Sequence, residues 1–252
     1  MIMIEKIISG GQTGADRAAL DVAIELGIPH GGWMPKGRKT EEGRLPDAYH
    51  LLETKSIDYA QRTELNVVDS DGTLILSHGP LAEGSALTQE LARKHRRPCL
   101  HIDLEELSDS KAAEIINTWI DARQIKILNV AGPRASSDPK IYQATKKVLR
   151  AVIDRYLPHT VEEAVKEIIT QLTLKEKTAI ANMKDNEFSS LFLSLGVHIR
   201  RKFGLLSGNK PLLDSCRLLS GDKDIHEDGA SAFIIRELWK RLRQTHSLRP
   251  VK

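Results

Sequence analysis

Three glycine-bearing segments of this sequence carry residues that could bind an anion. Each follows an apolar run and leads into helical spacing, where backbone N–H groups are unpaired and the helix dipole favours negative charge. They read "SGGQTGADRAAL", "SHGPLAEGSALTQE" and "NVAGPRASSDP". The candidate ligand-binding residues are Gly10, Gly11, Gln12, Thr13, Gly14 and Arg17 in the first, Gly79, Glu83, Gly84, Ser85 and Thr88 in the second, and Gly132 and Arg134 in the third.

The first segment matches neither standard nucleotide fingerprint. It is not G-x-G-x-x-G, and it lacks the G-K-[ST] ending of the ATPase loop. Taken alone it fits a phosphate cradle or a plain tight turn equally well. The second segment favours the cradle, because two such loops could converge on one anion. Ser85 is expected to be the N-cap of the helix that follows it.

A connector between the first two helical stretches adds cations. Its sequence is "HGGWMPKGRKTEEGRLP", which is rich in Gly, Pro and charge. Lys36 and Arg38 are predicted to grip an anion from this loop, and the alternative is an ordinary solvated connector. Trp33 could stack on a base or pterin ring or act as a packing plug.

The next helical stretch places a phenol, a guanidinium and a carboxamide on one face. Tyr59, Arg62 and Asn66 stand at i, i+3 and i+7. We expect Arg62 to face the ligand. Asp71 is a second candidate, with turn formation before a glycine as its alternative role.

The elements that must position these residues alternate between strand and helix. Apolar β-branched runs at 6–9, 73–77, 98–102 and 127–131 predict strands, and helical spacing predicts helices at 15–26, 58–67, 85–95, 110–122 and 139–156. This alternation is typical of an α/β domain with a Rossmann-like, doubly wound parallel sheet. In such a sheet, ligands bind at the carboxyl ends of the strands, where the glycine segments lie.

After "RYLPHT" the strand signal stops. The spacing from 161 to 244 is helical, and Thr160 with Glu163 matches a capping box. We therefore predict two domains, a Rossmann-like domain at 1–159 and a small all-α domain at 160–252.

Composition narrows the function classes. The chain has 252 residues, 40% hydrophobic and 28% charged, with a net charge of +3. No signal peptide or membrane span is recognised, so a cytoplasmic location is expected. Cys99 and Cys216 stand in dissimilar contexts and are predicted to be buried thiols. The basic clusters "HIRRKFG" and "LWKRLR" are typical of the solvated faces of core helices, so nucleic-acid binding is not favoured.

Several ordered motifs together resemble a known family. The stretches "SGGQTGADRAALDVAIELGIPHGGWMPKGR", "DYAQRTELNVVDSDGTLIL", "GPLAEGSALT" and "LNVAGPR" are similar to the putative molybdenum carrier family, a Rossmann-like branch of the SLOG superfamily. The resemblance covers about residues 4–155, and the tail looks like a domain of unknown function that is sometimes fused to it. The resemblance implies a phosphorylated nucleotide or pterin ligand, such as the molybdenum cofactor, and a homo-oligomer.

Three functions follow as hypotheses. The first is a carrier-like protein that binds a phosphorylated small molecule. The second is a nucleotide hydrolase like the phosphoribohydrolases of the superfamily, which would need a carboxylate from among Glu83, Glu90 and Asp71. Glu83 departs from the superfamily's double-glycine pattern. The third is a single-strand nucleic-acid module that uses the basic tail. The sequence identifies no catalytic residue, metal set or cofactor.

Overall fold

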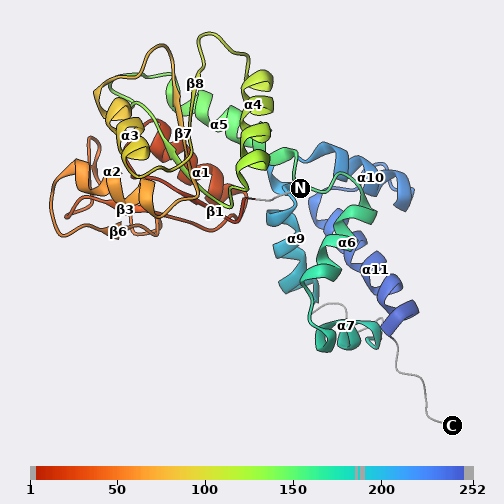
Figure 1. Cartoon of the computed structure of the whole chain (residues 1–252). Coiled ribbons are helices and arrows are strands. Elements are labelled where there is room, and N and C mark those ends of the chain that lie inside the picture. Colours follow the sequence, from red (N-terminus) through yellow and green to blue (C-terminus); the bar gives the residue numbers. More distant parts are fainter. Residues whose placement is uncertain (1–3, 185–186, 188–190, 247–252) are drawn as a thin grey trace. The chain divides into compact units, whose positions relative to one another are not determined.

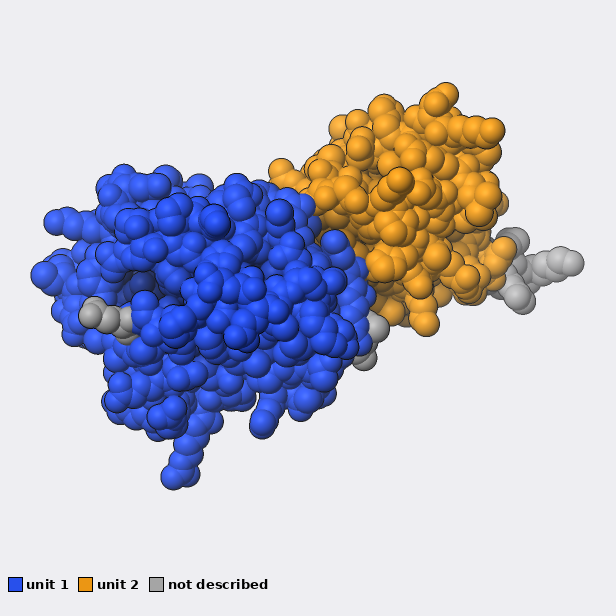
Figure 2. Space-filling view, turned by 90° about the horizontal axis from the view of Figure 1, so that it is seen from above, with its two compact units in different colours: residues 1–156 blue, residues 157–252 orange. Residues whose placement is uncertain are grey.

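The computed structural model describes residues 4–184, 187 and 191–246. The chain forms two compact units, unit 1 at 1–156 and unit 2 at 157–252, which Figure 2 colours separately. The boundary expected from the sequence was 159/160.

Unit 1 is built on a five-stranded parallel sheet with the order β2-β1-β9-β7-β8 (Figure 1). The strands are β1 (Lys6–Ile8), β2 (His30–Gly31), β7 (Gly72–Ser77), β8 (Cys99–Asp103) and β9 (Ile127–Ala131). The sequence of β7, GTLILS, is buried at every position, as expected for a strand covered on both faces. The predicted α/β, Rossmann-like fold is confirmed.

Helices cover the sheet. They are α1 (Ala15–Glu25), α2 (Tyr59–Val68), α3 (Glu83–Lys94), α4 (Asp109–Arg123) and α5 (Ile141–Asp154). Helix α5 packs against α1 and α4, whereas α2 packs against α3. This grouping is that of a doubly wound sheet, whose ligand crevice lies at the carboxyl ends of the strands.

Helix α3 begins earlier than predicted. Its N-cap is Ala82, and the Ala86 N–H donates to the Ala82 carbonyl at 2.8 Å. Ser85 therefore lies inside the first turn, and the prediction that it caps the helix is wrong.

The chain between β2 and α2, where no strand was predicted, contains four short strands. They are β3 (Trp33–Met34), β6 (Leu52–Glu53), and the antiparallel hairpin of β4 (Lys39–Thr40) and β5 (Gly43–Arg44). Two-residue strands leave almost no periodicity in a sequence, which is why they were missed. A separate small core of Leu20, Met34, Leu45 and Leu51 anchors this segment on α1.

Unit 2 is helical. Its elements are α6 (Val161–Gln171), α7 (Leu174–Ala181), η2 (Phe192–Gly196), α9 (Val197–Lys202), η3 (Leu205–Ser207), α10 (Lys210–Ser220) and α11 (Glu227–His246). The capping box predicted for Thr160 and Glu163 is present. Residues 188–190, within a stretch predicted to be helical, lie outside the described residues.

Both cysteines were predicted to be buried thiols. Both are free, but only Cys216 is buried, whereas Cys99, at the start of β8, is half-buried. None of the described helices is long and apolar enough to cross a membrane.

Candidate functional site

The loops after β1, β9 and β7 meet at the carboxyl edge of three adjacent strands. We call them the β1 loop (9–14), the β9 loop (132–140) and the β7 loop (78–82). The Ala15 N–H donates to the Pro133 carbonyl at 3.2 Å, and the Ala135 N–H donates to Thr13 Oγ1 at 3.1 Å. A Cβ on Gly14 would lie 2.3 Å from the Pro133 oxygen. The third glycine of the opening motif thus makes room for the β9 loop.

The β1 loop contains backbone donors that are not used. Gly10, Gly11 and Gly14 are buried, and their N–H groups have no acceptor among the described residues. Gly14 is the N-cap of α1 and supplies no capping side chain. Buried N–H groups are almost always paired with protein, water or ligand. This cluster, at the positive end of a helix, is therefore suited to an anion.

Arg62, which was expected to face the ligand, lies against the same loop. A Cβ on Gly10 would lie 1.6 Å from Arg62 Nη1, so the guanidinium covers this glycine. Arg62 Nη1 also donates to Asp16 Oδ2 at 3.2 Å. Burial raises the pKa of Asp16, and the charge of Arg62 opposes that rise. Arg62 Nε is buried and has no partner, so this cation has an unused donor.

The hairpin tip covers the β1 and β9 loops. Glu41 Oε1 accepts hydrogen bonds from Thr13 Oγ1 and from the Ser136 N–H at 3.1 Å, and its Oε2 accepts from Ser136 Oγ at 2.6 Å. The Glu41 N–H donates to Gln12 Oε1 at 3.0 Å. Desolvation would raise the pKa of Glu41, but the bonds from Ser136 and Thr13 outweigh it and hold that pKa low. Sequence reasoning missed Glu41 and Ser136.

The remaining predicted cations behave differently from one another. The guanidinium of Arg17 lies over the Tyr49 ring and 4.0 Å from the Glu42 carboxylate. The positive charge of Arg134 helps to lower the pKa of Glu41. Lys36 is exposed. Arg38 is buried, and its guanidinium donates to the backbone carbonyls of Leu45, Leu51, Pro46 and Tyr49. The prediction that Arg38 grips an anion is therefore replaced by a structural role, because its donors are used within the connector.

The β7 loop reaches the β9 loop through a pair that sequence reasoning also missed. His78 Nδ1 lies 2.7 Å from Asp138 Oδ2, and both side chains are mostly buried. A carboxylate on Nδ1 orients the ring and leaves Nε2 for proton transfer. The two residues are 60 positions apart and nothing in the local sequence of either marks them, so only the fold reveals the pair.

A serine–histidine contact nearby lacks the geometry of a nucleophile. Ser77 Oγ lies 2.8 Å from His101 Nε2, but the same hydroxyl donates to the Gly79 carbonyl at 2.8 Å. Since a hydroxyl has one proton, His101 must donate to Ser77 and cannot act as its base.

The described glycines and polar residues of the second segment make mostly local contacts. Gly79 has φ +73° and donates its N–H to Asp103. Gly84 is exposed, Ser85 is buried, and Thr88 Oγ1 donates to the Gly84 carbonyl within α3. Glu83 begins α3, and its side chain lies outside the described part of the structure. Glu90 is exposed on α3.

Asp71 does not join the loops. It precedes β7, at the opposite end of the strand, and its Oδ2 accepts the N–H groups of Lys126 and Ile127 at 3.0 and 2.7 Å. Its role is to fix the start of β9 beside β7. Asn66 and Trp33 are likewise structural, because Asn66 bonds both backbone groups of Trp33.

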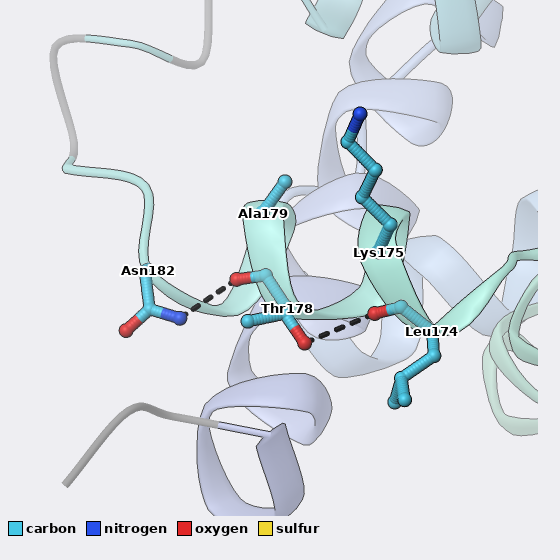
Figure 3. Close-up of a pocket in the computed structure, with 5 residues that line it drawn as sticks. All are labelled: Leu174, Lys175, Thr178, Ala179 and Asn182. Atoms are coloured by element: carbon cyan, nitrogen blue, oxygen red, sulfur yellow. Dashed lines mark hydrogen bonds between the residues drawn. The ribbon is translucent and has the colours of Figure 1, made fainter.

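Unit 2 has cavities without comparable chemistry. One, of about 570 Å³, is lined by Leu174, Lys175, Thr178, Ala179 and Asn182, and Figure 3 shows Thr178 and Asn182 bonded to carbonyls of their own helix. Another, of about 780 Å³, lies on α6, α10 and α11. Among the described residues, no group of three or more His, Cys, Asp or Glu could hold a metal ion.

Each of the two units matches a known family or domain. Residues 7–153 match the circularly permutated YpsA SLOG family, and residues 157–242 match a domain of unknown function, DUF6794. The 1.45 Å crystal structure of a protein described as a putative molybdenum carrier protein from Syntrophus aciditrophicus SB is 58% identical, with a TM-score of 0.60. That match covers 60% of this chain and 96% of the other. No curated protein gives a significant match.

Proposed function

Because the chain belongs to the circularly permutated YpsA SLOG family, we propose that unit 1 is a molybdenum-carrier-like protein that binds a phosphorylated nucleotide or pterin. The observation that carries the proposal is the set of unpaired N–H groups on Gly10, Gly11 and Gly14, at the uncapped start of α1. Arg62, beside them, adds a positive charge.

The donor set fits the phosphate of such a ligand. Free backbone N–H groups at the start of a helix, with a guanidinium beside them, are an arrangement that proteins use for phosphate. In the molybdenum cofactor these donors would hold the phosphate of the pterin. The described residues offer the molybdenum itself no cluster of ligands.

Calorimetry with matched ligand pairs tests the proposal. Adenosine monophosphate and adenosine form one pair, and a phosphorylated pterin and its dephosphorylated form the other. We expect the phosphorylated member of at least one pair to bind. Equal binding of both members, or no binding of any, would contradict the proposal.

Gly10→Ala sharpens this test. The new methyl group would displace the Arg62 guanidinium from the β1 loop, so affinity should fall. Gly84→Ala is the matched control, because a Cβ there meets no atom within 4 Å.

Hydrolysis of the bound nucleotide is a second candidate, favoured by the His78–Asp138 pair. The imidazole lies on the β7 loop, two strands from the β1 loop, where it would meet the part of the ligand beyond the phosphate. Release of free base from nucleoside monophosphates, abolished in His78→Gln and retained in the surface variant His95→Gln, is the expected result. No release by the wild-type protein excludes this candidate.

Nucleic-acid binding gains no support from unit 2. Arg200 pairs with Asp228 at 3.1 Å, Lys202 with Glu167 at 3.4 Å, and Arg243 lies over Trp239. These basic residues take part in contacts within the unit. We further propose a cytoplasmic homo-oligomer, and light scattering on the purified protein measures its assembly state.

A further inference from the structure

The carboxylate of Glu41 bridges two of the loops. Its oxygens accept hydrogen bonds from the hydroxyl groups of Thr13 and Ser136 and from the Ser136 N–H. These donors come from the β1 loop, which also carries the unpaired N–H groups of the glycines, and from the β9 loop. A carboxylate and a phosphate oxygen accept the same kinds of donor.

The charges around the hairpin tip agree with this interpretation. Arg134 acts electrostatically on Glu41, and Arg17 lies 4.0 Å from Glu42. Two acids at the tip of a hairpin thus face cations at the rim of the crevice. A second anion brought into this region would meet the Glu41 carboxylate at short range, where like charges repel strongly.

The hairpin is attached so that its tip can be exchanged for a ligand. Its backbone is bound to the β1 loop by one described hydrogen bond, from the Glu41 N–H to Gln12 Oε1. The Glu41 side chain itself is largely exposed, although its oxygens are bonded. The rest of the connector is held by other contacts: Leu45 and Leu51 pack on Leu20 of α1, and the Tyr49 hydroxyl donates to Asp21 at 2.7 Å, so exchange at the tip leaves these contacts in place.

We propose that Glu41 is an internal competitor, and that an anionic ligand displaces its carboxylate from Thr13 and Ser136 and lifts the hairpin from the β1 loop. This inference rests on the proposed function, since it concerns the same site. It adds the regulation of that site: the ligand-free protein is held closed by its own carboxylate.

The test compares Glu41→Gln with Glu42→Gln, which removes the same charge one residue along the hairpin. Adenosine monophosphate and inorganic phosphate are titrated into the full-length wild-type protein and both variants by calorimetry. Because Gln removes the repulsion and weakens the bonds to Thr13 and Ser136, Glu41→Gln should bind about tenfold more tightly than the wild type. Glu42→Gln should stay within about twofold.

Amide hydrogen exchange of residues 39–44 gives a second measurement. Ligand should speed exchange in the wild-type hairpin, and Glu41→Gln should show faster exchange before any ligand is added.

The outcomes separate the inference from the proposed function. If all three proteins bind with one affinity, or Glu41→Gln binds more weakly, the proposed function stands and the competitor role is wrong. If neither the wild type nor any variant binds either probe, the proposed function fails and the inference fails with it. Binding by Glu41→Gln alone supports both.

Discussion

Helix starts in the two units are built differently. In unit 1, α1, α3 and α5 follow the three central strands, and their N-caps, Gly14, Ala82 and Lys140, make no side-chain capping bond. In unit 2, the N-caps of α6, α7 and α10 are Thr160, Thr173 and Asn209. The side chain of each accepts a backbone N–H of its helix. A side-chain cap accepts a free backbone N–H group at the start of a helix. Without such a cap, the N–H groups of the first turn remain available to another loop, to water or to a ligand.

The same difference divides the helices of unit 1 into two groups. Helices α2 and α4 of unit 1 also have side-chain caps, from Asp58 and Ser108. Among the described helices of unit 1, the uncapped starts are therefore those that follow the three adjacent strands β1, β9 and β7. In unit 2, α9 also lacks a side-chain cap, but it continues directly from η2. Within unit 1 the pattern points to the same edge of the sheet as the glycine motif.

The largest expected effect is at Gly14. This residue has φ +74°, and an added Cβ would collide with the Pro133 carbonyl. Gly14→Ala should lower the free energy of unfolding of unit 1 by about 3 kcal/mol or more, because it adds strain to a steric clash. Urea denaturation measures the loss. Gly84→Ala, in the first turn of α3, should change stability by no more than about 1 kcal/mol and in the opposite direction. Equal losses in both variants would contradict the close approach of the β9 loop to Gly14.

Removing a cap from unit 2 should have a smaller effect. Thr160→Ala deletes the hydroxyl that accepts the Glu163 N–H at 3.2 Å, and should cost unit 2 about 1 kcal/mol. Hydrogen exchange in 161–171 detects the change. Thr170→Ala, near the other end of α6, is the control, and ligand binding by unit 1 should be unaffected by either substitution.

Adding a cap to unit 1 tests the comparison in the reverse direction. Ala82 has the extended conformation of an N-cap, so Ala82→Asp should stabilise α3 by about 0.5 to 1 kcal/mol. If the start of α3 takes part in anion binding, the same change should weaken binding of adenosine monophosphate. Unchanged affinity would restrict the anion site to the β1 and β9 loops.

The smallest effect is the response to acid. The backbone N–H of His159 and the hydroxyl of Thr173 lower the pKa of Glu163 and Glu176, respectively, in the two capping boxes. Their stabilising contribution is complete above the unfolded pKa of about 4.3 and is lost as the pH falls through the lower folded pKa. The ionisation of Asp16 affects stability in the opposite direction. Burial raises the pKa of Asp16, so its ionisation disfavours folding as the pH rises from about 4 toward the pKa of the folded state.

Stability measured from pH 3 to pH 7 checks both directions. Glu163→Gln should flatten the acid limb of unit 2, and Asp16→Asn should remove from unit 1 the loss of stability that the ionisation of Asp16 causes as the pH rises above about 4. An unchanged acid limb in Glu163→Gln would contradict the capping account.

The sequence was most informative where residues act locally. The strand runs, the capping box at Thr160 and the family resemblance all depend on neighbours along the chain, and all three were predicted correctly. Arg62 was identified from helical spacing. Ser85 was assigned to the wrong position because side-chain type alone marked the cap, whereas the bond from Ala86 to Ala82 sets the start of the helix.

The missed residues depend on distant contacts. Glu41 meets Ser136, and His78 meets Asp138, only once β9 lies between β1 and β7. Arg38 was misinterpreted for a related reason, since a guanidinium in a Gly- and Pro-rich segment gives no sign that the segment's own carbonyls surround it.

The arrangement around Arg38 also determines how the connector can move. One guanidinium holds four carbonyls of residues 45–51, and the Lys36 N–H donates to the Ser56 carbonyl at 3.1 Å, which joins the two ends of the segment. Residues 45–51, cross-linked in this way and packed on α1 through Leu45 and Leu51, form a rigid base for the hairpin. We therefore expect opening to be confined to residues 39–44 with few backbone dihedral changes, so that little conformational entropy separates the open and closed forms.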